Sequence, residues 1–205
     1  MGAVSGSAIP WKRILGFFAL MTVVYVTLMA PWPGLREAYA TVVRGGCQVL
    51  MGSFGSQGYA VFGPSPSRDP ESMSITLGRK GSRATTSGSI GTRYQAYVPM
   101  VLVVAMVLAT PLPWRRRALA LLWGLILVSL FVAFRIWLQL VVVFETTPGL
   151  TLWKLGPSWI WLLSLMDETL GTSTLSTYAI AAFIWLLVTF RSGDWERILG
   201  APSRG

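Results

Sequence analysis

The chain has 205 residues, of which 53% are hydrophobic and 12% are charged. A soluble domain averages about 25% charged residues, so this composition argues against a soluble globular domain. The high hydrophobicity argues equally against disorder. The sequence has no histidine, one cysteine (Cys47), and 17 lysines and arginines against 8 acidic residues. These counts exclude histidine-based catalysis, histidine-ligated metals and an intrachain disulfide, and no cofactor or metal is expected.

Apolar runs of roughly the length of a membrane span recur along the chain. The first, 14–30, carries no charge and lies between Trp11 and Trp32, where interfacial indoles belong. The later runs cover 97–112, 118–144 and 175–190. Since about 20 apolar residues cross a bilayer, the four runs predict four transmembrane helices. A shorter run, 158–166, predicts a re-entrant or interfacial helix.

Basic residues set the expected orientation of these spans. Lys12 and Arg13 precede the first run, and Arg115, Arg116 and Arg117 fill the turn between the second and the third. Cytoplasmic loops are enriched in such residues, so both termini are predicted to be cytoplasmic. The predicted fold is an all-α integral protein of the cytoplasmic (inner) membrane with about four transmembrane helices. Its parts are a cytoplasmic N-terminus (1–13), transmembrane helix 1 (14–30), an extracytoplasmic segment (31–96), a transmembrane core with helices 2–4 (97–190) and a cytoplasmic tail (191–205).

The extracytoplasmic segment is predicted to contain a small α+β element between spans one and two. Apolar residues at helical spacing between 35 and 50 predict an amphipathic helix on the outer surface. Residues 59–62 form a short strand candidate. Apolar and polar residues alternate from 72 to 77, and a glycine-flanked turn follows at 78–81. Residues 82–87 are then suited to form the returning strand. This pattern predicts a β-hairpin.

Arg135 is the most informative single residue, because an arginine inside an apolar span costs at least about 2.5 kcal/mol. Gln139 lies four residues further on, on the same helical face. Two interpretations are equally weighted: a functional contact inside the protein, or a side chain that reaches the outer interface. Asp167 and Glu168, before the last run, are candidate partners for Arg135 or for a cation. The simpler interpretation of this pair is an acidic helix N-terminus at the interface.

Other chemically interesting residues give weaker signals. A basic cluster of Arg79, Lys80, Arg83 and Arg93 is suited to anionic lipid headgroups or an acidic polymer, although solvated hairpin charges explain it more simply. Nucleic acid is not expected as a partner. Cys47 has no histidine to activate it and is interpreted as a small apolar filler.

Three segments together resemble the core of the exosortase/archaeosortase family, membrane transpeptidase-like enzymes that process proteins with C-terminal sorting signals. The glycine-rich stretch 50–58 resembles the family's outer glycine-rich segment, and 111–117 resembles its basic turn. Phe134-Arg135-Ile136 resembles its arginine motif. The resemblance covers roughly residues 35–190 and implies that Arg135 is the family arginine.

The family's other catalytic residues are missing from the matching positions. Val132 stands where the family has asparagine, the cysteine position falls near 91–94, and the histidine region falls at about 167–178. Neither of these two stretches contains the required residue. The resemblance therefore implies a degenerate member without cysteine-dependent cleavage. Thr92 or Tyr94 as a substitute nucleophile would have no suitable base.

Three functional hypotheses follow from this reading. The first is an exosortase-like membrane protein without cysteine-dependent peptidase activity, which binds a sorting signal or a partner protein at the outer membrane face through Arg135, Gln139, Arg93 and Tyr94. The second is a membrane scaffold subunit of an export or polysaccharide assembly complex. The third is an enzyme with a site built from Arg135, Asp167 and Glu168. The expected partners are membrane lipid and either a membrane protein or a sorting-signal protein, and the oligomeric state stays open.

Overall fold

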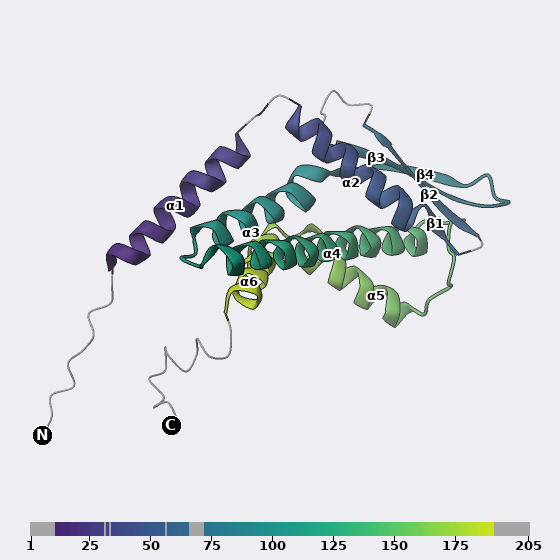
Figure 1. Cartoon of the computed structure of the whole chain (residues 1–205). Helices are drawn as coiled ribbons and strands as arrows, with labels where there is room; N and C mark the ends of the chain where they lie inside the picture. The colour runs from purple at the N-terminus through teal and green to yellow at the C-terminus, as the bar shows by residue number, and fades with distance from the viewer. Residues whose placement is uncertain (1–10, 31, 33, 56, 66–71, 191–205) are drawn as a thin grey trace, which may run out of the picture.

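The computed structural model describes residues 11–30, 32, 34–55, 57–65 and 72–190. The first ten residues of the predicted N-terminal segment and the predicted tail 191–205 lie outside this range. Within it, helices gather around one long helix, and a small antiparallel sheet lies at one end of that helix (Figure 1).

The long helix is α4 (Trp114–Thr146), and its N-terminal half packs against α3 (Val98–Ala109) and α6 (Thr174–Thr189). Pro111 and Pro113 prevent α3 from continuing and turn the chain back into α4. The two helices approach closely at Gly124, where an added Cβ would lie 2.9 Å from the Cγ1 of Val103. Helix α1 (Trp11–Met29) packs against α3. This half of the molecule is a helical layer with its own apolar core.

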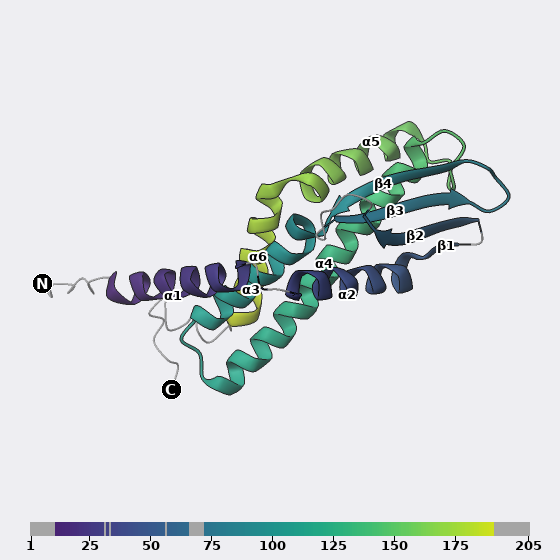
Figure 2. The ribbon, with the colours of Figure 1, turned by 90° about the horizontal axis from the view of Figure 1, so that it is seen from above.

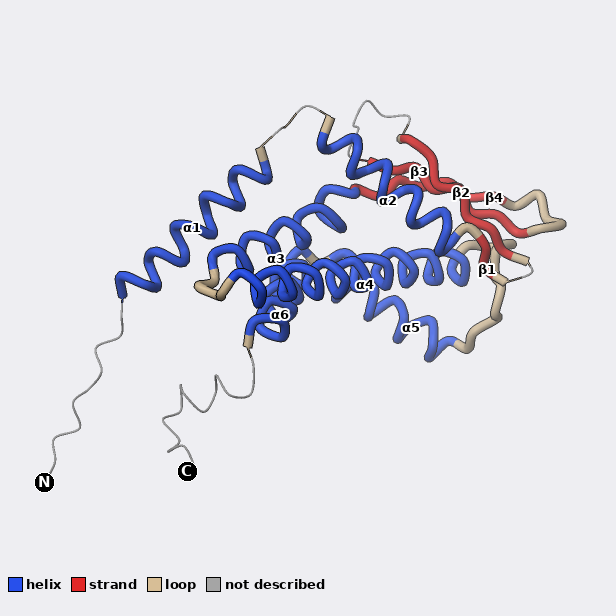
Figure 3. Tube along the Cα trace, in the orientation of Figure 1, coloured by secondary structure: helices blue, strands red, loops and turns tan. Residues whose placement is uncertain are grey.

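The sheet lies against the C-terminal half of α4, as the red strands in Figure 3 show. Its strands are β1 (Ser53–Phe54), β2 (Gly58–Pro64), β3 (Ser72–Arg79) and β4 (Thr85–Gly91), hydrogen bonded in that order and all antiparallel. Helix α2 (Leu35–Met51) also packs on the sheet. One face of β3 is buried because Met73, Ile75 and Leu77 alternate with polar residues and pack toward α4. The predicted hairpin is confirmed, with its second strand three residues later than expected.

The chain bends sharply after the sheet and α4. Helix α5 (Pro157–Met166) continues into the short π-helix η2 (Asp167–Thr172), and the axis then turns by 72° into α6. Seen from above, α5 runs beside the C-terminal half of α4, and α6 crosses beneath α3 (Figure 2). A second π-helix, η1 (Arg93–Tyr97), joins β4 to α3. The bend and η1 bring the beginning of α6 and the end of the sheet to the middle of α4.

The predicted all-α fold with about four transmembrane helices is wrong. The chain has a four-stranded antiparallel sheet. Among the described residues, α4 alone is a single helix long and apolar enough to cross a membrane. A second candidate arises if the bent pair 157–171 and 174–189 counts as one span. The apolar helices at 14–29 and 93–109 are shorter than the roughly 20 residues that a span needs. Most of the apolar runs that were predicted to be transmembrane helices are short helices that pack on one another.

Candidate functional site

Arg135 lies on the inner face of α4 and is 2% exposed. Its Nε donates to the carbonyl oxygen of Gly171 at 3.2 Å, and Nη2 donates to the same oxygen. Its Nη1 donates to Oγ1 of Thr177, itself 2% exposed, at 2.7 Å. The interpretation that Arg135 reaches the outer interface is therefore wrong, because the side chain makes its contacts inside the protein, to a backbone carbonyl and a threonine hydroxyl.

These bonds hold the bend between η2 and α6. Gly171 is the next-to-last residue of η2, and Thr177 is in the first turn of α6. A carbonyl at such a break lacks the helical partner it would have in a continuous helix, and the guanidinium supplies donors in its place. Nε2 of Gln139 donates to the same oxygen at 3.4 Å, from the face of α4 that carries Arg135. A Cβ at position 171 would meet the carboxylate of Asp167, so a side chain there would force that carboxylate to move.

A groove of about 410 Å³ opens next to this cluster, between β4 and α4. Asp167 of η2 and Gln139 of α4 contribute its polar groups from the helical side. The positive charge of Arg135 acts on the Asp167 carboxylate, yet Arg135 is not among the residues that line the groove. The opposite wall consists of β4 residues and the buried β3 side chains beneath them: Ile75, Leu77, Thr86, Ser87, Gly88, Ser89 and Ile90.

The groove lies beside a glycine on the inner face of β4, Gly88, which stands between Thr86 and Ile90 on that face. Gly88 pairs with the buried Ile75, so it lies on the face of the sheet that packs toward α4. A Cβ at Gly88 would meet no atom within 4 Å. Whereas β3 fills the space against α4 with Ile75 and Leu77, and Ile90 of β4 also packs on this core, Gly88 leaves its position open. A single glycine in the edge strand thus creates the cavity beside Asp167.

The structure does not bring all the sequence-predicted residues to this site. Arg93 and Tyr94 lie in η1, where the Arg93 guanidinium stacks 5.7 Å from the Tyr94 ring centre, and neither lines the groove. Glu168 is exposed and also lies outside the lining. The predicted basic cluster is divided, because Arg79, Lys80 and Arg83 are at the β3–β4 turn whereas Arg93 follows the other end of β4. Among the described residues, no three acidic or cysteine side chains gather to hold a metal ion.

Glu145 is a buried charge whose role the sequence did not indicate. It is 8% exposed, and its two oxygens accept three backbone N–H groups of the following loop. The donors are Leu152 at 3.1 Å, Trp153 at 2.9 Å and Leu155 at 3.1 Å. The carboxylate therefore fixes the loop that closes the end of the sheet, rather than serving Arg135.

Cys47 lies on α2 in the apolar core that this helix shares with α4 and the sheet, and is 6% exposed. Burial raises the pKa of its thiol to about 11. Since the thiolate is the reactive form, the folded protein holds very little nucleophile at neutral pH. The prediction that Cys47 is an apolar filler agrees with this position, and the residue is not among those that line the groove.

We expect maleimide to label Cys47 at least about 100-fold more slowly in the folded protein than in the unfolded chain, because a thiol pKa near 11 replaces the ordinary value of about 8.5. The labelling rate of the folded protein should rise about tenfold per pH unit between pH 7 and 9, because the thiolate fraction rises by that factor. Time-resolved mass spectrometry measures the rate, with protein unfolded in dodecyl sulfate as the reference. Equal rates in both states would contradict the buried position.

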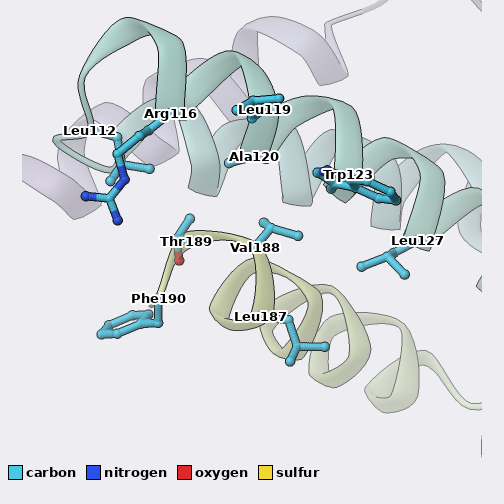
Figure 4. A pocket seen from close by; sticks show the side chains of 10 residues that line it. All are labelled: Leu112, Arg116, Leu119, Ala120, Trp123, Leu127, Leu187, Val188, Thr189 and Phe190. Atoms are coloured by element: carbon cyan, nitrogen blue, oxygen red, sulfur yellow. The ribbon is translucent and has the colours of Figure 1, made fainter. Parts of the chain in front are cut away.

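A second groove, of about 320 Å³, lies at the opposite end of α4. Figure 4 shows Leu119, Trp123 and Leu127 of α4 on one side and Leu187 and Val188 of α6 on the other. Arg116 and Thr189 are its polar side chains. It lacks the converging polar groups of the β4 groove. The β4 groove, which adjoins the buried Arg135 cluster, is therefore the candidate functional site.

Comparisons of the chain with protein-family models, with curated proteins and with solved structures gave no match. The resemblance to exosortases therefore stays a prediction.

Proposed function

We propose that this protein binds an extended segment of a partner protein along β4, with one side chain of that segment in the β4 groove. A sorting signal is one such segment. The observation that carries the proposal is a side-chain-sized cavity directly beneath an open edge strand. Strand addition at a sheet edge is a common mode of peptide recognition, in which the backbone gives affinity and pockets for alternate side chains give specificity.

The two edges of the sheet differ in a way that favours this use of β4. At one edge, β1 has two residues, too few to template another strand. At the other, β4 has seven residues, and in the described part of the chain no strand pairs with its outer side. Proteins usually block such edges with proline, lysine or other charges. The β4 sequence TTSGSIG contains none of these, so this edge is open to pairing.

The site is better suited to binding than to cleavage. Cysteine chemistry is unsupported because the chain's one cysteine is buried beneath α2 and its histidine count is zero. Arg135, which corresponds in the resemblance to the family arginine, directs its donors at Gly171 and Thr177 rather than into the groove. Its role is to position η2 and thereby Asp167. An enzyme that uses Arg135, Asp167 and Glu168 together is disfavoured, since only Asp167 lines the groove.

We further propose that α4 crosses a membrane, with the sheet beyond its C-terminal end. Large apolar side chains are exposed on α1, α4 and α6, among them Phe18 at 54%, Leu130 at 61% and Phe183 at 57%. Exposed apolar surface on this scale marks contact with lipid or with another protein. Placement in the inner membrane and cytoplasmic termini stay predictions.

A scaffold role remains the second candidate because of α5. No residue of this helix is buried, and Trp159 and Trp161 are 61% and 66% exposed. A short helix with exposed indoles is suited to a membrane interface or to a neighbouring subunit. This surface is separate from the β4 groove and does not compete with peptide binding.

Filling the groove tests the proposal. Gly88→Leu should be accepted by the fold, because a Cβ there meets nothing within 4 Å, and the leucine should occupy the groove. The probes are fluorescently labelled peptides of seven residues, the length of β4. Their central residue is varied, and the flanking residues are serine, valine and threonine. We expect fluorescence anisotropy to show binding to the full chain in detergent, weakened at least about tenfold by Gly88→Leu, a loss of 1.4 kcal/mol or more.

Gly91→Leu is the matched control. Gly91 is on the same strand and also has open space around it, but it pairs with Ser72 on the outer face of the sheet. It should leave peptide binding unchanged. Equal binding by the wild type and Gly88→Leu, or no binding of any heptapeptide, would overturn the proposed function.

A further inference from the structure

Building on the proposed function, we infer that the β4 groove takes a lysine or arginine side chain of the bound segment. The inference rests on the chemistry of the groove lining. The lining combines apolar side chains with the polar groups of Asp167 and Gln139, and a long cationic side chain is complementary to both.

The polar end of the groove is rich in acceptors. A carboxylate such as Asp167 accepts hydrogen bonds at about four lone-pair sites and donates none when ionised, so it can bind an incoming cation in addition to its existing contacts. Gln139 directs its Nε2 at the carbonyl oxygen of Gly171, which leaves its Oε1 as an acceptor. An ammonium or guanidinium group carries three to five donors and no acceptor, and therefore fits this end.

The walls suit the hydrocarbon stem of such a side chain. Ile75 and Leu77 of β3 and Leu140 and Val143 of α4 line the groove together with Asp167. Lysine and arginine bury their methylene groups on apolar surface while the charged head finds a polar partner. The volume of about 410 Å³ has room for one long side chain.

Arg135 is the charge that opposes this inference, since it is close enough to act on Asp167. Its guanidinium is 2% exposed, lies outside the lining, and makes three hydrogen bonds to Gly171 and Thr177. An incoming cation would thus contact the carboxylate directly, whereas Arg135 acts on it from outside the groove lining. A glutamate in the groove would instead place two carboxylates together, which is unfavourable.

The experiment uses the heptapeptides described above with lysine, norleucine or glutamate at the centre, bound to the full chain in detergent. Norleucine keeps the stem of lysine and lacks its ammonium group. We expect the lysine peptide to bind about tenfold more tightly than the norleucine peptide, and the glutamate peptide most weakly. Asp167→Asn should reduce the lysine preference to near unity. The control, Glu168→Gln, removes a neighbouring charge outside the groove and should keep it.

Because Asp167 is close to Arg135, Asp167→Asn can also disturb the fold. Gln139→Met therefore tests the site from α4, and we expect it to lower the lysine preference about threefold. Equal affinity of the lysine and norleucine peptides, or a preference retained in both Asp167→Asn and Gln139→Met, would overturn the inference while leaving peptide binding in place. Absence of binding by all three peptides would overturn the proposed function and this inference with it.

Discussion

Replacing Arg135 with methionine should lower the free energy of unfolding by about 3–5 kcal/mol, the cost of removing one partner from a buried charged contact. Methionine keeps most of the stem but leaves the Gly171 carbonyl, the Thr177 hydroxyl and the Asp167 carboxylate without the guanidinium. The bend between η2 and α6 should loosen first, since these bonds join its two sides. The change in stability is measured by thermal unfolding of both proteins in the same detergent, with maleimide labelling of Cys47 as the signal that reports unfolding.

A graded series separates the hydrogen bonds from the charge. Thr177→Val removes one neutral acceptor and should cost about 1 kcal/mol. Arg135→Lys keeps the charge, but its ammonium group cannot bridge Gly171 and Thr177 as the planar guanidinium does. Its loss of unfolding free energy should therefore lie between those of Thr177→Val and Arg135→Met. Arg83→Ala, at the exposed hairpin turn, should change stability by no more than about 0.5 kcal/mol. An unfolding midpoint for Arg135→Met equal to that of the wild type would show that the buried contacts contribute nothing.

The sequence predicted the elements whose signals come from neighbouring residues, such as the strands of the sheet. Alternation at 72–77 followed by a glycine-flanked turn identified the β3–β4 hairpin, and the strand candidate 59–62 lies inside β2. The arginine inside an apolar run, with Gln139 one turn later, left an internal contact and the outer interface equally weighted, and the structure shows the internal contact. These signals are carried by neighbouring residues, so one chain without relatives was enough to find them.

The number of spans could not be read from the same information. A run of apolar residues looks alike whether its helix meets lipid or packs on other helices, as Val103 and Val107 of α3 do with no exposed surface. The sharp bend at η2 divides what the sequence presents as consecutive apolar segments. Length and packing, rather than hydropathy, decide between the two cases.

The groove was also beyond sequence reasoning. Its lining includes Gly88 of β4 and Asp167 of η2, which are far apart in the chain and come to one groove through strand pairing and the packing of the sheet on α4. In the sequence, Gly88 is one glycine in a serine-rich stretch. Its significance is the side chain it lacks, which becomes visible when the opposite wall is known.

Glu145→Gln should make the loop that follows α4 open more often. The carboxylate accepts N–H groups on both sides of Lys154, which has a left-handed backbone with φ 50°. Hydrogen bonds to a charged group contribute about 1.5–3 kcal/mol each. Glutamine keeps one acceptor oxygen and turns an NH₂ group toward the N–H of Leu155, so one such bond is lost and two donors face each other. Local opening of the loop should therefore become at least about tenfold more frequent.

Limited trypsin digestion measures this opening, because Lys154 is itself a cleavage site within the loop. Cleavage after Lys154 should be at least about tenfold faster in Glu145→Gln than in the wild type, since proteolysis follows the population of the open form. Cleavage after Lys12, exposed on α1 at the other end of the molecule, should not change and serves as the internal control. The same rate after Lys154 in both proteins would mean that the loop is held by its other contacts, such as the bond from Arg79 to the carbonyl of Thr151. Glu145 would then be a buried charge without a structural role in the loop.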